Sequence, residues 1–151
     1  MANKEVLMEE YVGLLATKFK NSNKFIVEIK SSQAALKKME LERAGATVQE
    51  LRRAVTDAKK DAICFLLMEL SEFLGDQQLV KSSKTTRMFM QWGIKQIISK
   101  LKDLGVEMTE KEMKELTIDA CMERIEKLKK NKFELEAKLA VLKYYESVYS
   151  L

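Results

Sequence analysis

The chain has 151 residues, a formal net charge of +4 and 46% hydrophobic residues, which suits one domain that buries a core without disulfides or metals. It contains no histidine, which excludes Ser–His and Cys–His nucleophilic pairs and removes the commonest neutral metal ligand. No apolar run approaches the ~18 residues that a membrane-spanning helix needs, so we expect no membrane insertion. The absence of proline and the presence of only five glycines predict long helices joined by short loops.

The two cysteines, Cys64 and Cys121, each lie among apolar residues and are far apart in sequence. Two thiols are too few for a zinc site without histidine. We therefore expect reduced thiols buried in the core. Unpaired cysteines and the lack of a recognisable signal peptide favour a cytoplasmic location.

Three helices are predicted in the first half of the chain. The first covers residues 4–20, with Asn3 as its N-cap and apolar residues at three- and four-residue intervals. Residues 25–29 are β-branched and aromatic enough for a strand, but no second β-rich run exists to pair with them. We therefore interpret them as the start of a helix that ends near Arg43, and strand remains the alternative.

The third predicted helix begins at the clearest local signal in the chain. Thr47 and Glu50 form a capping box, in which each side chain satisfies a backbone N–H of the other residue. The helix is apolar nearly all round in its second half, which predicts a central, buried helix over residues 48–74. We expect Gly75 to end it, and residues 75–83 to form a loop that Leu79 and Val80 hold against the body.

The remaining predicted helices lie at residues 84–104 and 110–151. Gly105 ends the first of them, and a second capping box at Thr109 and Glu112 begins the other, a pattern typical of an antiparallel helical hairpin. No glycine or proline follows, so residues 110–151 form either one helix of about 60 Å or two helices broken near Asn131. The sequence thus predicts an all-α bundle of five or six helices in a single domain, 1–151, with 110–151 as a candidate projecting helix.

One apolar pattern in the last helix indicates an interface. Cys121, Leu128, Leu135 and Leu142 recur every seven residues, accompanied by Ile125 and Leu139. This period is typical of a helix that packs along another helix. Lys132 and Glu146 interrupt it, so a dimer seam and packing within the same chain both stay open.

Further candidates for protein contact lie near the start of the fourth predicted helix and at the C-terminal end. Met88, Phe89, Met90 and Trp92 crowd two turns, so some of them face water in a compact bundle. The candidate protein-interaction residues are Met88, Phe89, Trp92, Leu128, Leu135, Leu142, Tyr145 and Tyr149.

Charged clusters provide two other hypotheses. Between residues 81 and 102 six basic residues occur with no acidic one, and another basic run covers residues 127–132; such surfaces suit nucleic-acid backbones. The candidate nucleic-acid contacts are Lys81, Lys84, Arg87, Lys95, Lys127 and Lys130. Glu69, Glu72 and Asp76 share one region of the third predicted helix and are the candidate ligands of a Mg²⁺-dependent phosphohydrolase.

The favoured function is a non-enzymatic protein-interaction module of adaptor, regulator or inhibitor type that self-associates through its C-terminal helix. A basic nucleic-acid-associated helical protein is the alternative, and the phosphohydrolase is a distant third because solvent-facing acids explain its residues equally well. We predict no catalytic, cofactor or metal site. The partner's identity is not encoded in any motif of the sequence.

Overall fold

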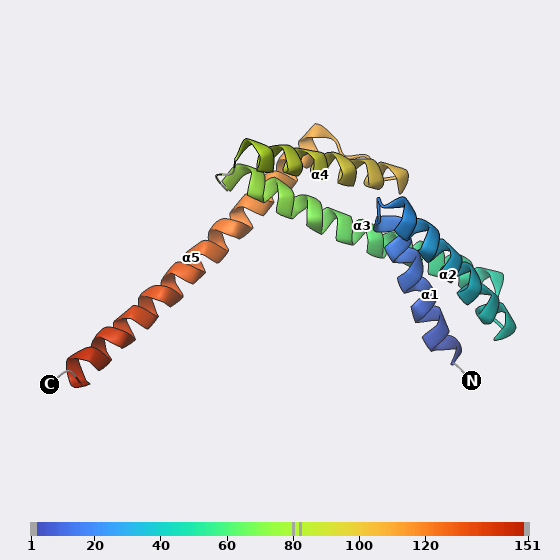
Figure 1. Ribbon diagram of the computed structural model, residues 1–151, viewed down its shortest axis with the longest axis horizontal. Coiled ribbons are helices and arrows are strands. Elements are labelled where there is room, and N and C mark those ends of the chain that lie inside the picture. The colour runs from blue at the N-terminus through green and yellow to red at the C-terminus, as the bar shows by residue number, and fades with distance from the viewer. Residues whose placement is uncertain (1–2, 80, 82, 150–151) are drawn as a thin grey trace.

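The structure, a computed structural model, describes residues 3–79, 81 and 83–149. Across these residues the chain forms five α-helices and no strand (Figure 1), which confirms the all-α class and identifies residues 25–29 as helical. The helices are α1 (Lys4–Lys20), α2 (Lys24–Arg43), α3 (Val48–Leu79), α4 (Lys84–Asp103) and α5 (Glu110–Tyr149).

Helix α3 is the spine of the molecule. Helix α1 packs against its N-terminal part and α2 packs against α1, whereas α4 and the beginning of α5 pack against its C-terminal part (Figure 1). Its buried residues are mostly four positions apart, so they form a continuous row that turns by about 40° per step around the helix at ~100° per residue: Leu51, Ala54, Ala58, Ala62, Leu66, Leu70 and Leu74. The fold therefore has two hydrophobic clusters, which the two halves of α3 share.

The first cluster joins α1, α2 and α3. Leu7, Tyr11 and Leu15 of α1 meet Leu41 of α2 and the small Ala58 of α3. Burial raises the pKa of the Tyr11 hydroxyl above its usual value, and the nearby Glu42 carboxylate adds to this rise. The spacing of the α1 residues predicted this buried face.

Caps and turns in this part of the chain are local in origin. The Asn23 side chain accepts hydrogen bonds from the backbone N–H groups of Phe25 and Ile26 and so begins α2. Gly45 adopts a positive φ of 92° in the turn before α3, a conformation that side chains disfavour. The predicted capping box is present: Glu50 N donates to Thr47 Oγ1 at 3.1 Å, and Thr47 N donates to Glu50 Oε1 at 3.4 Å.

The second cluster joins α3 and α4. Leu66, Leu70 and Leu74 of α3 pack with Ile94, Ile97 and Leu101 of α4, and Met113 and Leu116 of α5 cover its edge. The predicted end of α4 is confirmed. Gly105 has a φ of 87°, Val106 N donates to Leu101 O at 2.8 Å, and the Val106 side chain packs against the cluster.

Two predictions for α3 are wrong. Gly75 does not end the helix, which continues to Leu79, so the predicted loop over residues 75–83 shrinks to a short connection. Gly75 is buried instead at the crossing with α5, where an added Cβ would lie 3.5 Å from the Cβ of Ala120. Leu79 is exposed rather than holding a loop in place, and Val80 lies outside the described residues.

Helix α5 is one continuous helix of 40 residues, so a break near Asn131 does not occur. The Thr109 hydroxyl accepts a hydrogen bond from Glu112 N at 3.2 Å and caps its start. The antiparallel hairpin predicted for α4 and α5 is not confirmed, because both helices pack mainly against α3 rather than along each other.

We expect the substitution Leu66→Ala to lower the free energy of unfolding by about 2–5 kcal/mol, because it leaves a cavity in the core that the surrounding side chains fill only in part. Leu66 is 2% exposed. Lys60→Ala, on the exposed side of the same helix, should change the free energy by less than about 0.5 kcal/mol. Denaturant unfolding of the two variants measures both values, and equal losses would contradict the assignment of α3 as the spine.

Candidate functional site

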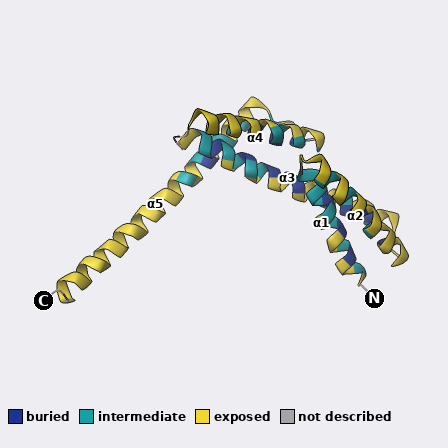
Figure 2. Cartoon of the chain, viewed as in Figure 1, coloured by how far each residue is buried: buried dark blue, intermediate teal, exposed yellow. Residues whose placement is uncertain are grey.

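The C-terminal part of α5 leaves the body of the molecule. Ala120 is buried against α3 beside Gly75, and Arg124 forms an ion pair with Asp76 at the end of this contact. Every residue from Ile125 to Val148 is exposed, and this part of α5 runs away from the other helices (Figure 2). These 24 residues extend for about 36 Å at ~1.5 Å per residue. We call them the free segment.

A row of aliphatic side chains, here the leucine stripe, follows one side of the free segment. From Cys121 onward, its positions are alternately four and three residues apart. Two of these positions carry charged residues, Lys132 and Glu146. Its apolar members are all more than two-fifths exposed: Ile125, Leu128, Leu135, Leu139 and Leu142. The sequence pattern located this stripe, and the structure places it in solvent.

A second apolar row, here the aromatic stripe, lies on the opposite side of the free segment, since its members are offset from the leucine stripe by about half a turn at ~100° per residue. It consists of Phe133, Ala137, Val141, Tyr144 and Val148, all exposed. The sequence-based prediction did not include this stripe, because none of its residues belongs to the seven-residue repeat from Cys121. Counting apolar residues on both sides of the helix finds it.

The predicted tyrosines belong to this end of α5. Tyr145 is exposed and its ring meets that of Tyr144 edge to face, with ring centroids 6.3 Å apart. The side chain of Tyr149 lies outside the described residues.

A groove of about 980 Å³ lies where α3 and α5 diverge. Leu67 and Met68 of α3 and Leu116 and Leu128 of α5 contribute apolar lining, and Lys127 contributes a positive charge. Since Leu128 belongs both to the groove and to the leucine stripe, the apolar surface of the free segment continues onto the body.

Two more exposed apolar faces occur on the body. Met88, Phe89 and Trp92 of α4 point away from α3, and Trp92 is 62% exposed, as the protein-contact hypothesis requires. On α2 an unpredicted row lies on the outer face: Phe25, Ile29, Leu36 and Met39. The β-like composition of residues 25–29 thus reflects apolar side chains on an uncovered helical face.

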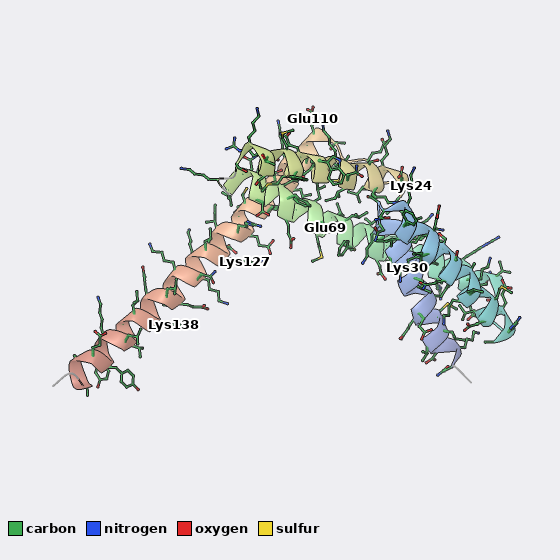
Figure 3. The ribbon with its side chains drawn as sticks, in the orientation of Figure 1. Lys24, Lys30, Glu69, Glu110, Lys127 and Lys138 are labelled. Atoms are coloured by element: carbon green, nitrogen blue, oxygen red, sulfur yellow. The ribbon has the colours of Figure 1, made fainter. Side chains whose placement is uncertain are left out.

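The candidate basic residues are all exposed, but they belong to two separate regions. Lys81, Lys84, Arg87 and Lys95 lie on or just before α4, whereas Lys127 and Lys130 lie on the free segment. Figure 3 shows Lys127 near the point where α5 leaves the body and Lys138 far along the free segment. The structure brings Lys81 and Lys127 together at the groove between α3 and α5, but it does not gather all six into one patch.

The acidic candidates do not converge. Asp76 is engaged with Arg124, and Glu69 lies midway along α3 (Figure 3). Within residues 3–79, 81 and 83–149, no three acidic or thiol side chains come close enough together to hold a metal ion. No observation on this part of the chain favours the Mg²⁺ hypothesis.

The prediction that both cysteines are buried is wrong. Cys64 is exposed and Cys121 is partly exposed. Cys64 lies about 200° around α3 from the buried Ala62 at ~100° per residue, so it faces away from both clusters. Phe65 and Met68 are exposed as well, and Lys20 Nζ lies 4.1 Å from the Phe65 ring centroid. The middle of α3 is covered on one side only.

The whole chain exposes far more surface than a compact protein of its size. Its accessible area is 11643 Å². A folded monomer of 17.4 kDa exposes roughly 7,900 Å², so the excess is roughly 3,800 Å². An excess of this size reflects the exposed faces of α2, α4 and α5 together.

None of the helices in the described part of the chain combines the length and the apolar character needed to cross a bilayer. Comparison of the chain with protein-family models, with curated proteins and with solved structures found no match.

We expect Cys64 to react with a thiol reagent in the native protein almost as fast as in the denatured protein, because its side chain faces solvent. Cys121, which is partly covered, should react more slowly. Timed labelling followed by mass analysis of the two cysteine peptides measures both rates, and protection of Cys64 in the native state would show that α3 is covered on this side.

Proposed function

We propose that this protein is a non-enzymatic protein-interaction module that docks through the free segment of α5. The observation that supports this proposal is the continuous exposure of 24 helical residues that carry an apolar stripe at seven-residue spacing. Monomeric proteins rarely leave contiguous apolar surface of this extent in water, and larger patches mark interaction sites.

The shape of the free segment suits a partner that is itself helical. A repeat of alternating four and three residues keeps one seam turned toward a helix that runs alongside. No glycine or proline interrupts the segment, so the partner meets a preformed rod. A preformed surface loses less conformational entropy on binding than a disordered one.

The connection to the body supports the same role. Close packing at Gly75 and Ala120 and the ion pair between Arg124 and Asp76 hold α5 at the end of α3. The direction of the free segment is then set by α3 and does not depend on its own apolar residues. Those residues are consequently available for a partner.

We expect the double variant Leu135→Glu, Leu142→Glu to lose association while its body keeps its stability. Both substitutions place charges in the middle of the leucine stripe, which disfavours burial against a partner. Neither residue touches the two clusters, so the free energy of unfolding should change by less than about 0.5 kcal/mol. Sedimentation and denaturant unfolding of the variant measure the two effects.

The double variant Phe133→Glu, Val141→Glu is the matched control. It adds the same charge to the same helix at residues of similar exposure, but on the aromatic stripe. If either variant unfolds the body, its stripe belongs to the core of the protein and the proposed docking role is wrong.

A second candidate function is binding to nucleic acid through α4. The observation that favours it is the run of six basic residues without an acidic one over residues 81–102, beside the exposed Phe89 and Trp92. Lysines and arginines bind phosphate backbones, and exposed aromatic rings stack on single-stranded bases.

If α4 binds single-stranded nucleic acid, the triple variant Lys84→Gln, Arg87→Gln, Lys95→Gln should bind more weakly and with a shallower salt dependence. Each lost phosphate contact reduces the slope of log affinity against log salt by about one. The matched control removes Lys24, Lys30 and Lys38 from α2, which lies at the other end of α3 (Figures 1 and 3). Equal effects of the two triple variants would indicate unspecific charge attraction only.

A further inference from the structure

We propose that the occupant of the leucine stripe is the free segment of a second copy of this chain, arranged antiparallel to the first. This inference rests on the proposed docking function and adds the partner, the direction and the register. In this arrangement position 137 of each copy lies level with its own counterpart.

The N-terminal end of the free segment and its two charged stripe positions set this register. Toward the N-terminus a partner helix cannot continue far beyond Ile125, because Ala120 is packed on α3 and Arg124 is tied to Asp76. Of the antiparallel registers that keep the two stripes in contact, this one places both charged positions level with a leucine of the second copy. Leu128 then lies level with position 146 of the second copy, and position 132 with Leu142.

The two charged positions in the leucine stripe favour the antiparallel direction. In a parallel pair in register, Lys132 faces Lys132 of the second copy and Glu146 faces Glu146, and like charges in a seam repel. In the antiparallel pair, Lys132 lies beside Leu142 of the second copy, one turn from its Glu146. In the antiparallel pair each charged position therefore lies beside an aliphatic residue and near an opposite charge, whereas in the parallel pair it lies beside a like charge.

The basic run of the free segment leads to the same direction. Residues 125–132 contain four lysines and one glutamate, a net charge of +3. A parallel pair places two such runs side by side. In the antiparallel pair the run lies along residues 142–149 of the second copy, which contain Lys143 and Glu146 and have no net charge.

The free segment is a better partner for itself than the other exposed rows are. The row on α2 extends over 15 residues from Phe25 to Met39, whereas the leucine stripe extends over 18 residues from Ile125 to Leu142 and continues into the groove through Leu128. A stable complex hides about 800 Å² on each partner, and the chain has an excess of exposed area several times larger than this.

Disulfide trapping tests the direction directly. In a background with Cys64→Ser and Cys121→Ser, one protein carries Leu128→Cys and another, tagged to change its mass, carries Glu146→Cys. We expect the equilibrated and oxidised mixture to give mainly the mixed disulfide dimer, because the two positions are level. Each protein alone should form little disulfide-linked dimer. In an antiparallel pair of one variant, the thiols of the two copies lie 18 positions apart along the helices, or about 27 Å, and a disulfide needs Cα atoms within about 7 Å.

Efficient disulfide formation by Leu128→Cys with itself would establish a parallel pair and overturn the proposal. So would a dimer in which the mixed disulfide does not form. The variant Leu135→Glu, Leu142→Glu should raise the dissociation constant of the dimer by at least ~10-fold, whereas Phe133→Glu, Val141→Glu should leave it within ~3-fold. The reverse order would place the seam on the aromatic stripe and overturn the proposal.

Sedimentation of the unmodified chain separates this inference from the docking function. A folded monomer at high concentration would exclude the second copy as the occupant. If the Leu135→Glu, Leu142→Glu variant of that monomer kept its stability, the docking function would stand with a different helical partner. If the variant unfolded, both proposals would be wrong.

Discussion

The architecture depends on a single apolar row along α3. Because its buried residues form one continuous row from Leu51 to Leu74, one helix contributes three buried residues to each hydrophobic cluster. The buried side chains are mostly small in the first half of the row, with alanines at positions 54, 58 and 62, and larger in the second half, where they are leucines. A single row of buried residues cannot enclose the helix, so the part of its surface that carries Cys64 and Met68 stays in solvent. Both ends of the molecule are connected through this spine.

The position of the free segment follows from how α5 meets that spine. Gly75 lies beside Ala120, where an added Cβ would meet the Cβ of Ala120 at 3.5 Å, and the charge pair of Asp76 and Arg124 lies directly after this contact. Beyond it α3 ends at Leu79, and α5 continues for 24 residues with no helix left to cover it. The C-terminal end of α3 thus determines where α5 becomes exposed to solvent. The apolar content of α5, on two opposite sides, belongs to that surface rather than to the core.

The exposed surfaces of the molecule differ in kind. The free segment combines stripes of leucine and aromatic residues with a basic run, whereas α4 presents Trp92 and its neighbours among lysines. A seven-residue repeat like that of the first surface suits a helical partner, and a basic surface without acidic residues, like the second, suits an anionic one. These two chemistries lie on different elements, so one can be changed without altering the other.

The sequence by itself determined the helices, because caps, glycine turns and apolar spacing act within a few residues. Asn3, the Thr47–Glu50 box and Gly105 set boundaries that agree with the structure to within one residue. The sequence also located the leucine stripe. Only the tertiary structure decided which apolar faces are covered. An apolar helix face looks the same in sequence whether a neighbour covers it or not, so the exposure of Cys64, the continuation of α3 through Gly75 and the freedom of α5 beyond Arg124 depend on contacts between residues far apart in the chain.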